Sequence, residues 1–140
     1  MTLIDLTNAL KSLLVYADPE IDVRSAYDYN VDDPRHSKTV IVRATNARML
    51  TPGLGDAFVT VEILGFTFVS EDHDRAQLNA ICAATQTLIN GWTMAQITAA
   101  INRDNITADG LIDQQVSSID AEDSYVFNLT FTLAIQNFNT

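Results

Sequence analysis

The closing segment of the chain carries the pattern that most limits the folds open to it. Between residues 125 and 136, large apolar side chains occupy every second position, and smaller or polar side chains stand between them. Six such alternations in a row predict a strand with one face on a core and the other on solvent or another subunit. A short acidic segment, 120–123, connects this strand to a weaker one at 111–119, which predicts an antiparallel hairpin.

Helical periodicity predicts an amphipathic helix at the start of the chain. Leucines recur there at helical spacing from Leu3 to Leu14. Thr2 is placed to cap the first turn, with Asp5 three residues later. A proline follows at position 19 and disfavours helical geometry at the residue before it, so the helix is predicted to end near Ala17.

Two further helices are predicted in the middle of the chain. An apolar stripe runs through residues 78–89, with Ser70 as the predicted N-cap and acidic residues in the first turn. Gly91 is predicted to end this helix in a left-handed conformation. Thr93 and Gln96 form a capping-box pattern that predicts the start of a shorter helix.

Strands are predicted between the first two helices. Residues 38–44 and 58–69 are rich in β-branched and aromatic side chains, and the segment 51–56 between them is predicted as a loop. Residues 25–31 have weaker strand character. Asp109 and Gly110 together predict a turn before the 111–119 strand.

The strand at 58–69 changes parity along its length. Val59 and Ile63 fall on one face, whereas Phe66 and Phe68 fall on the other. A bulge or bend at Gly65 would bring both sets to the same face. Alternatively, the strand is covered on both sides, as in a subunit interface.

The order of these elements is typical of an α+β fold. We expect an antiparallel or mixed β-sheet of about four to five strands, with the N-terminal helix and the central helix packed on one face. The 140 residues fit one domain, 1–140, that is long enough to bury a core. A single cysteine excludes a disulfide scaffold, and no apolar run predicts a membrane span. The first residues lack a signal-peptide pattern, so we expect a soluble product in the cytoplasm when it is made.

The charge of the chain is acidic overall and unevenly distributed. Eighteen acidic residues against eight basic ones give a net charge of −10, which argues against a general nucleic-acid-binding surface or docking on anionic membranes. Arg35, Lys38, Arg43 and Arg48 lie in a stretch without acids, whereas residues 104–140 carry six acids and no base. Opposite charges on different segments favour head-to-tail contacts between copies, which can close into rings. Scattered solvated charge is the alternative.

No residue pattern predicts a catalytic, metal or cofactor site. The two histidines and one cysteine are not spaced as zinc ligands. The acidic cluster 71–74 fits a helix start, because adjacent helical residues do not converge on one ion. Glycines at 53 and 55 lead into a strand and lack the phosphate-loop ending. Cys82 fits a buried helical position rather than that of a nucleophile.

Over nearly its whole length, the chain resembles the tail-terminator (tail-completion) proteins of tailed bacteriophages. The resemblance rests on an arrangement of elements rather than on a short motif. The N-terminal amphipathic helix is the first element. The strand Phe-Val-Thr-Val-Glu-Ile-Leu-Gly at 58–65 then leads into the acidic-capped helix at 72–90, and the closing strand is Tyr-Val-Phe-Asn-Leu-Thr-Phe-Thr-Leu at 125–133.

The resemblance implies a structural virion protein rather than an enzyme, without cofactor or catalytic residues. It implies an α+β subunit that forms a homo-hexameric ring on the head-proximal end of the tail tube, contacting the tube protein. The ring would stop tube polymerisation, present a surface to the head–tail connector or stopper protein, and let DNA pass during ejection. An acidic lumen suits that passage, because it repels phosphate.

The expected location is the neck of the virion tail, after assembly in the host cytoplasm and without a membrane. Another neck or tail component, such as a connector, stopper or tube subunit, is the main alternative. A small acidic ligand-binding domain or enzyme is a more distant alternative.

The residues predicted to form the subunit or ring interface fall in two groups. The basic residues would pair with acids of a neighbouring copy, and the 51–56 loop would meet an adjoining ring. The predicted residues are Arg35, Lys38, Arg43, Arg48, Thr51, Leu54 and Asp56.

Overall fold

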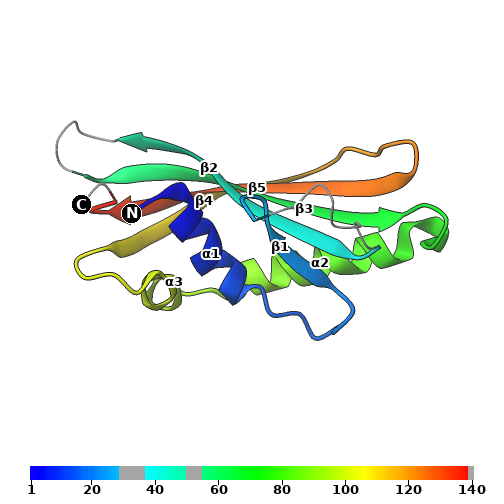
Figure 1. Cartoon of the computed structure of the whole chain (residues 1–140), viewed down its shortest axis with the longest axis horizontal. Helices are drawn as coiled ribbons and strands as arrows, with labels where there is room; N and C mark the ends of the chain where they lie inside the picture. Colours follow the sequence, from blue (N-terminus) through cyan, green and yellow to red (C-terminus); the bar gives the residue numbers. More distant parts are fainter. Residues whose placement is uncertain (29–36, 50–54, 139–140) are drawn as a thin grey trace.

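The computed structural model describes residues 1–28, 37–49 and 55–138, which form three α-helices and one five-stranded mixed sheet (Figure 1). The sheet order is β1-β2-β3-β5-β4. β1 is parallel to β2, and the other neighbouring strands are antiparallel, so the predicted α+β class is confirmed. The strands are β1 (Asp22–Ser25), β2 (Thr39–Met49), β3 (Ala57–Phe68), β4 (Thr107–Ser118) and β5 (Ser124–Gln136).

The helices α1 (Leu3–Leu13), α2 (Ala76–Gly91) and α3 (Met94–Ile101) lie on one face of the sheet (Figure 1). The core lies between the helices and the sheet, with α1 over β2, α2 over β3 and β5, and α3 over β4. Alternate residues of β5 are buried in this core, which confirms the alternation predicted for the closing strand. No helix in the described part of the chain is long and apolar enough to cross a membrane.

The bulge that we considered at Gly65 is absent, because β3 stays in register with both neighbours through this residue. Gly65 pairs with Phe127 of β5, and a Cβ atom on Gly65 would lie 2.0 Å from Cε1 of the Phe127 ring. Glycine thus makes room for an aromatic ring rather than for a bend. Phe66 and Phe68 consequently face away from the core and are half-buried.

The strand boundaries differ from those predicted. β2 continues past residue 44 to Met49, because its second half pairs with the beginning of β3. A register shift between Ala44 and Asn46 interrupts this pairing. Asp109 lies within β4 rather than in a turn, at a register shift between Ala108 and Gly110.

Two predicted segments, a weak strand and a loop, are only partly described. β1 begins and ends earlier than the weak strand predicted at 25–31, and residues 29–31 lie outside the described residues. Of the predicted loop 51–56, only Gly55 and Asp56 are described.

The capping boxes of α1 and α3 are confirmed, but two helix ends differ from prediction. α1 ends at Leu13 rather than Ala17, because Leu14 leaves the helical conformation and is buried. Gly91 has no positive φ, so the predicted left-handed ending is wrong. The chain instead leaves α2 in an extended conformation at Trp92. The Trp92 ring packs edge-on against Phe131, with 6.3 Å between the ring centroids.

The start of α2 also differs from prediction. Asp74 and Arg75 have left-handed backbone conformations, with φ of 56° and 60°, and α2 begins only after them at Ala76. Ser70 is therefore too far away to be the N-cap.

Candidate assembly interface

The sheet has an outer face that no described helix covers (Figure 1). On β3, every outward-facing side chain is half-buried, and most of these side chains are large and apolar. Such a row is unusual on a face open to solvent, where polar residues normally alternate with the core residues. The outward apolar residues of β3 are Phe58, Leu64, Phe66 and Phe68.

Two strands provide edges at opposite sides of the sheet. β1 pairs only with Thr39–Val42, so among the described residues no strand pairs with the free side of 43–49 in β2. Ala44 on this side is already bonded, because its N–H donates to the Thr7 hydroxyl and its carbonyl accepts from the Tyr27 hydroxyl. On the other side of the sheet, β4 pairs with β5 alone among the described strands. Exposed strand edges are the places where further chains can associate with a sheet.

The two edges carry opposite charges. Arg43 and Arg48 are exposed on β2. The charged residues of β4 and of the β4–β5 connection are all acidic, and one of them, Asp120, is paired with Arg75 of the same subunit. The charge separation along the sequence thus becomes a separation across the sheet, which the sequence could not show because it does not specify strand order. The exposed acids are Asp109, Asp113, Asp120, Glu122 and Asp123.

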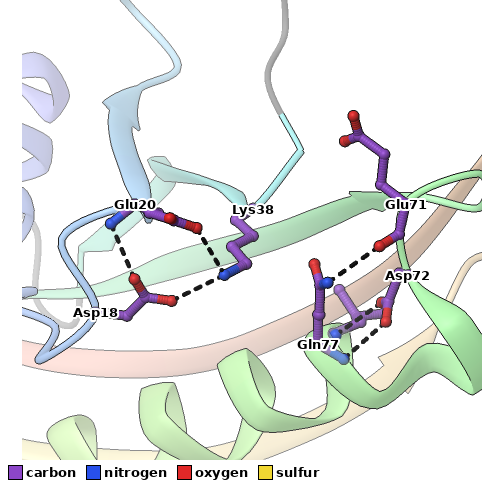
Figure 2. Close-up of polar contacts among 7 residues, drawn as sticks. Asp18, Glu20, Lys38, Glu71, Asp72 and Gln77 are labelled. Atoms are coloured by element: carbon purple, nitrogen blue, oxygen red, sulfur yellow. Dashed lines mark hydrogen bonds and ion pairs between the residues drawn. The ribbon is translucent and has the colours of Figure 1, made fainter.

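Lys38, a predicted interface residue, has carboxylates of its own subunit as partners (Figure 2). Its Nζ atom lies 3.1 Å from a carboxylate oxygen of Glu20 and 3.1 Å from one of Asp18. Hydrogen bonds to Glu20 and Asp18 raise the pKa of Lys38. The pKa of Asp18 is lowered, first by the backbone N–H of Glu20 and then by Lys38. These pairs connect the segment after α1 to the start of β2, and contact of Lys38 with a neighbour stays a prediction.

The other predicted interface residues have different surroundings. Arg43 donates to Glu62 across the β2–β3 pair at 2.9 Å, and half of its side chain remains exposed. Arg48 is exposed and has no ion-pair partner among the described residues. Asp56 accepts a hydrogen bond from the backbone N–H of Asn137 at 3.0 Å. Three predicted residues lie outside the described residues: Arg35, Thr51 and Leu54.

The acidic cluster 71–74 forms part of a helix start. Buried Asp72 accepts hydrogen bonds from the Thr67 hydroxyl at 2.7 Å and from the backbone N–H groups of Gln77 and Leu78 at 2.7 and 2.9 Å. Figure 2 shows its carboxylate directed at the first turn of α2, where the side chain of Gln77 also donates to the carbonyl of Glu71. Asp72 thus takes the capping role predicted for Ser70.

Further along α2, Cys82 is half-buried, and burial raises the pKa of its thiol. Among residues 1–28, 37–49 and 55–138, no group of three or more His, Cys, Asp or Glu side chains is arranged to hold a metal ion.

No protein-family model matches this chain, and no curated protein matches it.

Proposed function

We propose that the chain is a structural subunit of a phage tail that forms a hexameric ring at the head-proximal end of the tail tube. The ring stops tube polymerisation and joins the tail to the head connector or stopper. The observation that carries this proposal is the opposite charge of the two sheet edges, basic on β2 and acidic on β4.

A contact between unlike edges is heterologous, because each subunit uses a different surface toward each neighbour. Such contacts close into rings when the rotation between copies divides a full turn. Arg43 and Arg48 meet the acids of the next copy in this arrangement. Complementary charges of this kind select the partner and fix its register.

The outer face of the sheet gives the proposal further support. Its apolar row on β3 is only half-buried in the single chain, as expected for a surface that another protein covers in an assembly. The net charge of −10 is also compatible with a channel that DNA traverses without being held.

Reversing both edge arginines tests the proposed contact. The variant Arg43→Glu/Arg48→Glu is expected to lose ring formation, because the β2 edge then carries charge of the same sign as the β4 edge. Native mass spectrometry measures assembly, and circular dichroism measures folding. The control is Arg103→Glu, which changes an exposed arginine paired with Asp5 at 2.7 Å, outside both edges. Unchanged assembly of the double variant would remove the β2 edge from the interface.

Particles that lack the protein separate the proposed function from other neck functions. Electron microscopy is expected to show over-long tails, because nothing stops tube growth. Tails of normal length without heads would instead identify a connector or stopper.

A further inference from the structure

We infer that the carboxylate of Asp113 in one subunit binds the guanidinium of Arg48 in the next, in a cavity between β4 and the helices. This inference rests on the proposed function in one respect: the partner is a second copy in a head-to-tail ring.

The cavity has a volume of about 410 Å³ and lies between the end of α2, the start of α3 and the middle of β4. Its walls include Asn90, Trp92, Asp113 and Gln114. These side chains match the chemistry of arginine. The carboxylate of Asp113 can accept two parallel N–H bonds, and the amide oxygens of Asn90 and Gln114 can accept others. The indole of Trp92 can attract a cation over its face. Arginine suits such a site better than lysine, because its planar fork presents five donors.

Asp113 has no cation to neutralise it within the described part of its own subunit. It lies in a register shift of β4 between Ile112 and Gln115, with a left-handed φ of 58°, and is exposed. Such irregularities take a residue out of the strand ladder and re-aim its side chain. Residues 76–101, which form α2 and α3 on the other side of the cavity, include no charged residue. Asp113 is the only charged residue among the described residues that line the cavity.

Arg48 is the complementary group on the opposite edge. It is exposed near the end of β2 and, unlike Arg43, has no carboxylate partner among the described residues. An exposed arginine on one edge and an exposed aspartate on the other provide the charge complementarity that a head-to-tail contact needs.

The register of the sheet places Arg48 and Asp113 at similar positions along the strand direction. Across the strands, Arg48 is aligned through β3 and β5 with Gly110 of β4. Arg43 is aligned in the same way with Gln115. Asp113 lies between these two levels. Arg48 pairs with outward-facing Phe58 and so lies on the outer face of the sheet, whereas the cavity lies on the helix-covered face. The inferred contact therefore requires a ring axis parallel to the strands, with the β2 edge of each copy overlapping the helix-covered side of the next copy's β4 edge.

A charge swap tests the pair. Arg48→Asp and Asp113→Arg are each expected to raise the concentration needed for half-assembly by about tenfold or more, because each places like charges together. The double variant Arg48→Asp/Asp113→Arg restores the pair with its polarity reversed and is expected to assemble close to wild type. Asp113→Asn, which keeps the side-chain size, is expected to weaken assembly in the same direction.

Asp104→Arg is the control, because Asp104 is an exposed acid in the connection between α3 and β4 and lies outside both β4 and the cavity. It is expected to assemble like wild type and to give no rescue of Arg48→Asp. Native mass spectrometry over a concentration series measures assembly, and circular dichroism confirms folding. Normal assembly of the folded single variants, or no rescue by the swap, would overturn the pair while leaving the ring intact. Failure of the wild type to assemble, alone or on tail tubes, would overturn the proposed function and the pair with it.

Discussion

Gly65 lies under the ring of Phe127, and the fit leaves no room for a methyl group. In the sequence, the large apolar residues change from one face of β3 to the other near Gly65. Two features explain this change: the Phe127 ring fills the space at Gly65 on the core face, and the outer face has its own apolar row. A sequence pattern shows which residues alternate, but it does not show which ring from another strand covers a glycine.

The substitution Gly65→Ala is expected to lower the free energy of unfolding by about 1–3 kcal/mol, because the new methyl group overpacks against Phe127. Gly110→Ala is the control, because a Cβ atom there meets nothing within 4 Å; we expect a change within about 0.5 kcal/mol. Urea unfolding measures both. Equal stabilities of the two variants would contradict this account of Gly65.

At the scale of elements, the start of α2 depends on Asp72, which connects the end of β3 to the first turn of the helix. Asp72→Asn is expected to lower the free energy of unfolding by about 1–3 kcal/mol near neutral pH. The reason is that the Thr67 hydroxyl and the N–H groups of Gln77 and Leu78 lose a charged acceptor. Urea unfolding measures the difference.

This contribution depends on pH with a defined sign. Burial raises the pKa of Asp72, but hydrogen bonds from Thr67, Gln77 and Leu78 outweigh that effect and lower it below the usual 3.8. The stabilisation is therefore complete above the unfolded-state pKa and is lost as the pH falls through the lower folded-state value. The difference between wild type and Asp72→Asn should shrink as the pH falls from about 7 toward about 3. A difference that stays constant over this range would contradict the role of the charged carboxylate.

The elements differ in how far the sequence could predict them. Alternation and capping residues are local, so β5, the β4–β5 hairpin and the capping boxes of α1 and α3 were predictable. The start of α2 was not predictable from the sequence. It depends on tertiary contacts, which give Asp72 its capping role and accompany the left-handed conformations of Asp74 and Arg75. The candidate interface was only partly predictable. Its arginines could be identified from the sequence. Asp113 becomes an interface candidate only because the strand order puts β4 at an edge and a register shift takes Asp113 out of the strand ladder.

At the scale of the whole molecule, helices cover one face of the sheet, the other face has an apolar row, and the two edges differ in charge (Figure 1). A subunit with these three features suits a closed ring better than a monomer, because a ring pairs every basic edge with an acidic one. In the proposed function, such a ring caps a tail tube and leaves a channel for DNA.

The central claim is that the chain assembles into a ring, and electron microscopy of the purified chain, with and without cognate tail tubes, tests it most directly. We predict a six-fold ring, either free in solution or seated at one end of each tube. A chain that stays monomeric in both samples and leaves the tube ends bare would contradict the account.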